Sequence, residues 1–197
     1  LMLGVTDRVV YDLSDVLCGR CRPAKAIVSV PTARGNLHLL AAPVNRFFVP
    51  DRANLARLLT GLTGCYDLLL FDTAAGLGRG FDVAASVCDG ALIITHCDAV
   101  SVRDAAKAAG MLRRLSPRLV LNCFSRSQLG EDFPTVDAVI DAVGARLISV
   151  IPDDPTLPRA CARGKIPPAQ SPAMRELQDL ARRLAGERVL LNTQRFK

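Results

Sequence analysis

Residues 68–78 decide the expected fold, and they read Leu-Leu-Leu-Phe-Asp-Thr-Ala-Ala-Gly-Leu-Gly. Four apolar residues in a row, without alternation, predict a strand covered on both faces, as in a parallel sheet flanked by helices. The strand would end at Asp72, and a loop containing Gly76 follows. A carboxylate in this place can hold Mg²⁺ through water, while the loop brings a backbone N–H near a phosphate. Asp72 could equally cap the turn, so the segment alone leaves both interpretations open.

Further apolar runs repeat this pattern along the chain. They predict strands at residues 91–94, 119–121 and 147–151, and residues 37–41 predict another. Helical spacing lies between the runs, most clearly at residues 174–184, where Ser171 and Pro172 suit the start of a helix and Gly186 suits its end. Strands that alternate with helices predict an α/β fold with a mostly parallel, doubly wound sheet.

Polar residues follow the predicted strands, where an open α/β sheet binds its ligands. Asn122 follows one strand, and Pro152 with Asp153 follows the next. A side-chain amide offers both a donor and an acceptor, which suits the edge of adenine. Asn122 could instead cap a loop, and that alternative stays open.

Composition narrows the class of protein. The 197 residues fit one domain, and they contain no apolar run long enough to span a bilayer. The first residues lack the features of a secretory signal, and the seven cysteines are too scattered for a disulfide scaffold. We therefore expect a soluble cytoplasmic protein with reduced thiols. The net charge of +6 is spread along the chain, which favours a solvated surface over a nucleic-acid patch.

Cys18 and Cys21 form a C-x-x-C pair, which elsewhere binds metal or exchanges thiols. No second pair accompanies them, and neither His38 nor His96 has a partner at ligand spacing. The pattern favours a helix that ends near Gly19, and we expect no direct metal ligand.

Several motifs together carry a resemblance to a known family. They are Arg8-Val-Val-Tyr-Asp12, Asp72-Thr-Ala-Ala-Gly76, Gly80-Phe81, Ser101-Val-Arg-Asp104 and Val150-Ile-Pro-Asp-Asp154. In this order they resemble the landmarks of the MinD/ParA family of deviant Walker P-loop ATPases, and within it those of the MinD branch. The likeness predicts a nucleotide-binding domain over residues 1–187 and a tail over residues 188–197.

The resemblance implies an ATP- and Mg²⁺-dependent switch protein of division-site placement. Such a protein forms a nucleotide-dependent homodimer and works with regulators of the MinC and MinE type at the inner face of the cell membrane. The family does not imply binding to a specific nucleic-acid sequence. The roles carried over are Asp72 as the Walker B carboxylate near magnesium, Gly76 in the second switch loop, Asn122, Pro152 and Asp153 at the adenine, and Arg103 and Asp104 at the dimer or partner face.

Two departures from the family bear on ATP hydrolysis and on membrane binding. No G-x-x-x-x-G-K-[ST] pattern occurs, so we expect a fold without its first strand, P-loop and first helix, and negligible ATP hydrolysis by this chain alone. Residues 188–197 match a membrane-binding amphipathic helix poorly.

Two alternatives therefore stay open. The chain could be a non-catalytic remnant that keeps a partner-binding surface. It could also be another ATPase of the superfamily, of the flagellar-number, plasmid-partition or iron–sulfur scaffold type, because a shared fold does not fix function.

Overall fold

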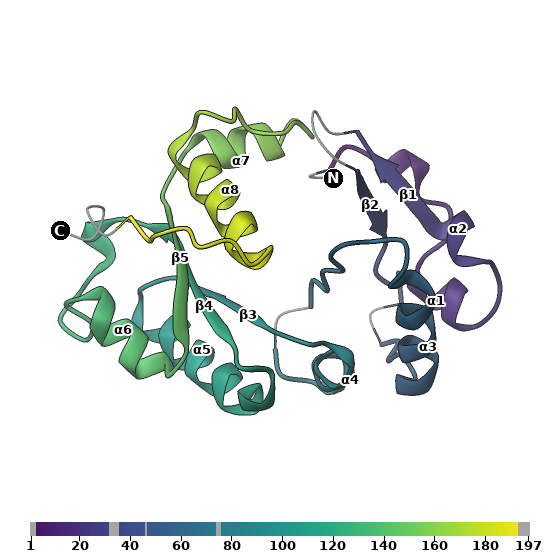
Figure 1. Ribbon diagram of the computed structural model, residues 1–197, viewed down its shortest axis with the longest axis horizontal. Coiled ribbons are helices and arrows are strands. Elements are labelled where there is room, and N and C mark those ends of the chain that lie inside the picture. The colour runs from purple at the N-terminus through teal and green to yellow at the C-terminus, as the bar shows by residue number, and fades with distance from the viewer. Residues whose placement is uncertain (1–2, 32–35, 46, 74–75, 193–197) are drawn as a thin grey trace. The chain divides into compact units, whose positions relative to one another are not determined.

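The computed structural model describes residues 3–31, 36–45, 47–73 and 76–192. The chain divides into two compact units (Figure 1). The first unit comprises residues 1–88 with 161–166, and the second comprises residues 89–160 with 167–197. The expected single nucleotide-binding domain over residues 1–187 stays a prediction.

The second unit contains a parallel sheet of three strands in the order β3-β4-β5. The strands are β3 (Leu92–Thr95), β4 (Arg118–Phe124) and β5 (Arg146–Pro152). Leu119, Val120 and Leu121 are fully buried although they follow one another. Successive side chains of a strand point to opposite faces, so β4 is covered on both sides. The strands predicted at residues 91–94, 119–121 and 147–151 are confirmed. Ile94 of β3 is 62% exposed, so the prediction of burial on both faces is wrong for that strand.

Helices cover both faces of this sheet (Figure 1). The helix α8 (Pro172–Leu184) lies on one face, where Val120 and Ile151 of the strands pack with Ala173 and Leu180 of the helix. The helices α5 (Ala99–Met111) and α6 (Val136–Val143) lie on the other face. Shorter elements connect these parts: η2 (Arg113–Leu115), η3 (Arg126–Gln128) and α7 (Thr156–Cys161).

The ends of α8 follow the sequence prediction. The Ser171 hydroxyl accepts the N–H of Met174 at 3.3 Å, and Pro172 occupies the first turn, where its missing N–H does no harm. Gly186, just past the helix, has a φ of +90°, a conformation that glycine adopts without strain. The predicted helix start and stop are confirmed.

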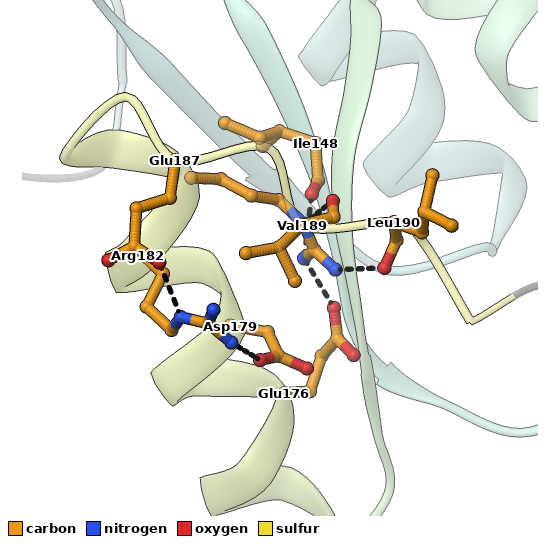
Figure 2. A network of polar contacts seen from close by, with 8 residues as sticks. Ile148, Glu176, Asp179, Arg182, Glu187, Val189 and Leu190 are labelled. Carbon is orange, nitrogen blue, oxygen red and sulfur yellow. Dashed lines mark hydrogen bonds and ion pairs between the residues drawn. The ribbon is translucent and has the colours of Figure 1, made fainter.

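A buried polar network ties α8 to β5 and to the segment after α8. Ile148 is an extra residue of β5, because Leu147 pairs with Leu119 while Ser149 already pairs with Val120. The guanidinium of Arg183 donates to the Ile148 carbonyl at 3.1 Å, to Glu176 at 2.8 Å, and to the carbonyls of Val189 and Leu190 at 3.0 Å each. Figure 2 shows Glu176, Ile148, Val189 and Leu190 converging from these three segments.

Glu176 completes this network. It also accepts the hydroxyl of Ser149 at 2.8 Å. The side chains of Arg183 and Glu176 are only 8% and 3% exposed. Burial of two opposite charges is tolerable only with such mutual pairing and additional hydrogen bonds. The network therefore fixes the register of α8 against the sheet.

The first unit contains a two-stranded antiparallel sheet and several helices. The strand β2 (Leu37–Leu40) confirms the strand expected at residues 37–41, and its partner is β1 (Ile27–Val30). The helices are η1 (Thr6–Arg8), α1 (Leu13–Leu17), α2 (Pro23–Ala26), α3 (Arg52–Leu62) and α4 (Arg79–Val87).

Asp12 joins two separate parts of this unit. Its carboxylate caps α1 by accepting the N–H groups of Ser14 and Asp15, and it also accepts the N–H of Val44 at 2.9 Å. Burial alone would raise the pKa of Asp12, but the hydrogen bonds from Ser14, Val44 and Asp15 outweigh it and lower the pKa. The motif at residues 8–12 thus has a structural role here.

The prediction of a strand at residues 68–71 is wrong. These residues form no strand, and the side chains of Leu68 and Leu70 are 56% and 74% exposed. A strand needs a neighbour that pairs with its backbone groups, and no strand of the described ranges provides one at residues 68–71. A run of apolar residues indicates that a segment can be buried. It does not indicate whether a neighbouring strand is present to pair with its backbone.

Two predictions about membranes concern the tail and the helices. Residues 188–192 carry no helix, and residues 193–197 lie outside the described residues. No helix in the described ranges combines the length and apolar character needed to cross a bilayer.

Candidate functional site

The carboxyl ends of β4 and β5 meet at one edge of the parallel sheet. Phe124, the last residue of β4, is the register partner of Pro152, the last residue of β5. The N–H of Asp153 donates to the Phe124 carbonyl at 2.9 Å and continues the pairing one residue further. Asn122, Pro152 and Asp153, which the sequence assigned to one site, therefore lie together within the second unit.

A bulge in β4 changes the direction of the chain at this edge. Leu121 pairs with Val150 and Phe124 pairs with Pro152, so Asn122 and Cys123 oppose the single residue between these partners. Cys123 has a φ of +51°, which is strained for a residue with a side chain and costs about 1 to 3 kcal/mol. Bulges of this kind commonly re-aim side chains next to functional sites. Asn122 is half-buried, while Asp153 is exposed.

Asp154 holds the loop after β5 in place, a role that its sequence context does not predict. Its carboxylate accepts the hydroxyl of Thr156 at 2.6 Å, the N–H of Thr156 at 2.9 Å and the N–H of Ala173 at 3.2 Å. These bonds, chiefly the one from the Thr156 hydroxyl, lower the pKa of Asp154 to about 2. The side chain is only 7% exposed. Asp154 thus anchors Pro152 and Asp153 to the start of α8. In the sequence, the only feature that could have indicated this role is the presence of a second carboxylate beside Asp153.

The end of β3 leads into α5, which carries two further predicted residues. Asp98 caps α5 by accepting the N–H of Ser101 at 3.0 Å, and the hydrogen bonds from Ser101 lower its pKa. Arg103 and Asp104 lie in the next turn and are exposed. Asp104 forms an exposed ion pair with Lys107 at 3.4 Å. Both predicted residues are thus accessible on the surface of α5.

Asp72 and Gly76 belong to the first unit. Asp72 is exposed, and it lies in an irregular segment instead of at the tip of a strand. Gly76 has a φ of +103°, which an L-residue rarely adopts, and a Cβ there would meet nothing within 4 Å. Glycine is therefore favoured at this position by its positive φ and not by lack of space for a side chain. A positive φ is typical of a loop that changes direction.

The cysteine pair behaves as a helix end. α1 ends at Leu17, and Gly19 follows with a φ of +73°. Cys18 and Cys21 are free thiols. No cluster of three or more potential metal ligands occurs among the described residues. The interpretation as a helix end is confirmed.

No protein-family model matches the chain, but several curated proteins that are similar to it are named MinD. A MinD relative from Nephroselmis olivacea is 30% identical over 195 residues, which cover 94% of this chain and 71% of the relative. Three curated MinD relatives are 29 to 31% identical to the chain, which spans 62 to 74% of their length.

Two solved structures agree with these relatives. A chain of the MinC:MinD cell division protein complex from Aquifex aeolicus matches with a TM-score of 0.83 and 32% identity, covering 97% of this chain and 79% of that one. The septum site-determining protein MinD complexed with Mg-ADP from Pyrococcus horikoshii matches with a TM-score of 0.77 and 28% identity, covering 93% and 76%. The α/β fold expected from the MinD/ParA resemblance is confirmed. Identity at this level over most of both chains shows that the chain belongs to the MinD family of septum site-determining proteins.

Proposed function

We propose that this chain is the switch portion of a MinD-like protein that places the division site, and that the edge at the ends of β4 and β5 binds the adenine of ATP. The observation that carries the proposal is the meeting of Asn122, Pro152 and Asp153 at that edge. The side-chain amide of Asn122 can both donate to and accept from the edge of the base. Pro152 offers a rigid apolar surface for the ring, and the carboxylate of Asp153 can accept from the exocyclic amine.

The bulge at Asn122 and Cys123 supports this assignment. A strained residue persists where the surrounding structure holds it, and such strain clusters at ligand-binding positions. Asp154 supplies part of the support, because its three accepted hydrogen bonds fix the loop that follows Pro152. The edge is therefore held ready before a ligand arrives.

ATP and Mg²⁺ are the proposed cofactors, since the Pyrococcus horikoshii relative was solved with Mg-ADP. Asp72 would contact the ion through water, and the conformation of Gly76 would let the following loop bring an N–H to a phosphate. A carboxylate suits a hydrated Mg²⁺ ion, while a backbone N–H suits the phosphate. No G-x-x-x-x-G-K-[ST] pattern occurs in this sequence, so the proposal includes negligible hydrolysis by this chain alone.

The proposal includes partners of the MinC type, because the similar chain from Aquifex aeolicus was solved in a MinC:MinD complex. Arg103 and Asp104 are exposed on α5 and are the residues proposed to face a second copy or a regulator. Regulators of the MinE type and attachment to the inner face of the membrane are proposed on the same resemblance. A non-catalytic, partner-binding role is the second candidate, and the exposed Arg103 and Asp104 of α5 support it as a contact surface.

Calorimetry with adenine and hypoxanthine nucleotides tests the adenine edge. The comparison uses this chain and the same chain preceded by a MinD-type P-loop segment, each with ATP or ITP in the presence of Mg²⁺. We expect the extended chain to prefer ATP, and Asn122→Ala to weaken ATP binding about tenfold, the effect of removing a hydrogen-bond partner of the base.

Asn192→Ala serves as the matched control, because Asn192 is an exposed asparagine of the same unit. Equal affinity for ATP and ITP, or an Asn122→Ala variant that binds ATP like the control, would remove Asn122 from the site. A folded, extended chain that binds no nucleotide but still captures a MinC-type partner would favour the non-catalytic role.

A further inference from the structure

An open groove lies at the opposite end of the sheet from the proposed adenine edge, at the amino ends of β4 and β5. Its volume is about 630 Å³. Small residues of α5 and α6, among them Ala109, Gly110 and Ala142, form much of its lining. Three arginines also line it, namely Arg113, Arg118 and Arg146. All three arginines are exposed, and none of the lining residues is acidic.

The arginines are placed close together by the fold itself. Arg118 and Arg146 are the first residues of neighbouring strands and are register partners. Like charges on directly opposed residues of neighbouring strands destabilise a sheet. Among the described residues, no ion pair joins any of the three arginines to an acidic side chain. The groove therefore gathers three arginines that form no ion pair with an acid of the described residues.

We propose that this groove is a docking site for an acidic peptide segment of a partner protein. Guanidinium groups bind carboxylates through two parallel hydrogen bonds, so carboxylate side chains match the three arginines. The small residues between them leave room for a peptide backbone and short apolar side chains. This surface is separate from the proposed nucleotide site, and the inference does not depend on it.

Other anions fit the groove less well. Single-stranded nucleic acid is usually held by aromatic side chains on which its bases stack, and no aromatic residue lines this groove. An anionic lipid surface is bound more firmly where exposed large apolar side chains can insert beside the charges, and none lines this groove. A short acidic peptide uses both the arginine charge and the small-residue lining, so it is the occupant that the groove favours.

Fluorescence anisotropy with the whole chain tests the proposal. The probe is a labelled peptide of alternating glutamate and alanine, and the same peptide with glutamine in place of glutamate reports binding without charge. We expect saturable, salt-sensitive binding of the glutamate peptide only. The triple variant Arg113→Gln/Arg118→Gln/Arg146→Gln should bind about tenfold more weakly, which is the sum of three exposed charge contacts.

The matched control removes the same charge elsewhere in the second unit, with Arg126→Gln/Arg159→Gln/Arg175→Gln, all at exposed positions. Gly110→Leu keeps every charge but fills the groove, and the fold should accept it because a Cβ at Gly110 meets nothing within 4 Å. We expect Gly110→Leu to weaken binding at least as much as the groove triple variant, and the control to bind like the unchanged chain.

Three results would overturn the proposal. Equal losses in both triple variants would mean that net charge alone attracts the peptide, and unchanged binding in Gly110→Leu would place the peptide outside the groove. Tighter, Arg118-dependent binding of an oligonucleotide or of phosphatidylserine vesicles would assign the groove to a different class of partner. Circular dichroism of each variant verifies folding. Arg113→Lys/Arg118→Lys/Arg146→Lys keeps the charge but loses the paired hydrogen bonds, so it should bind more weakly than the unchanged chain and more tightly than the glutamine triple variant.

Discussion

Replacement of Arg183 by methionine removes the centre of the buried network between α8, β5 and residues 189–190. Glu176, only 3% exposed, then loses the opposite charge that lies 2.8 Å away. Breaking a buried pair by removing one partner typically destabilises a protein by about 3 to 5 kcal/mol. Since a whole domain is stable by about 5 to 15 kcal/mol, Arg183→Met should remove a large fraction of the stability.

A double-mutant cycle separates the charge pair from the carbonyl contacts. Glu176→Met/Arg183→Met replaces both charges by apolar groups, and such replacements are often neutral. The Ile148 carbonyl still loses its donor and the buried Ser149 hydroxyl loses its acceptor, so we expect a residual cost of about 1 to 3 kcal/mol for each of these two groups. The two single losses should therefore add up to clearly more than the double loss, with a coupling energy of about 2 kcal/mol or more.

Urea unfolding followed by far-ultraviolet circular dichroism measures these values. The matched control is Arg182→Met, because Arg182 is the neighbouring arginine and its ion pairs with Asp179 and Glu187 are exposed. Exposed pairs contribute only about 0 to 1 kcal/mol. An Arg183→Met loss no larger than that of Arg182→Met, or single losses that simply add, would refute the reasoning.

Three further predictions concern other contacts. Asp154 has its pKa lowered from 3.8 to about 2, so its contribution to stability is present above pH 4 and lost as the pH falls toward 2; urea midpoints of Asp154→Asn should change less across this window than those of the unchanged chain. Ser171→Ala removes the cap of α8 and should cost about 1 kcal/mol in thermal or urea unfolding, whereas a loss near zero would contradict the cap. Asp72→Asn, in a chain extended by a MinD-type P-loop segment, should weaken Mg²⁺-dependent ATP binding about tenfold in a calorimetric titration; Asp82→Asn, also an exposed acid of the first unit, should leave it unchanged.

The sequence predicted best those elements whose stabilisation is local or follows from burial. Residues 119–121 read as a two-faced strand because all three side chains are buried, and Ser171 with Pro172 marked the start of α8 through hydrogen bonds within one helical turn. Asn122, Pro152 and Asp153 could be assigned to one edge because parallel strands bring their carboxyl ends together.

Residues whose roles depend on distant partners escaped prediction. Asp154 accepts an N–H from Ala173, and the Arg183 network depends on a bulge at Ile148, which no local pattern announces. The positive φ of Cys123 is likewise set by strand register, not by residue type. The run at residues 68–71 was misread for the converse reason, because apolar residues cannot report whether a neighbouring strand exists.

The contacts of Arg183 also determine how a mechanical force applied to the carboxyl end would be transmitted through the second unit. Tension applied beyond Leu190 would reach the guanidinium through the carbonyls of Val189 and Leu190 before it could unwind the last turn of α8. The same guanidinium holds the Ile148 carbonyl, so the load would be shared with β5 and, through its ladder, with β4. In a force-spectroscopy experiment this arrangement would act as a shear clamp, and its rupture would release residues 189–190 and free α8 to unravel.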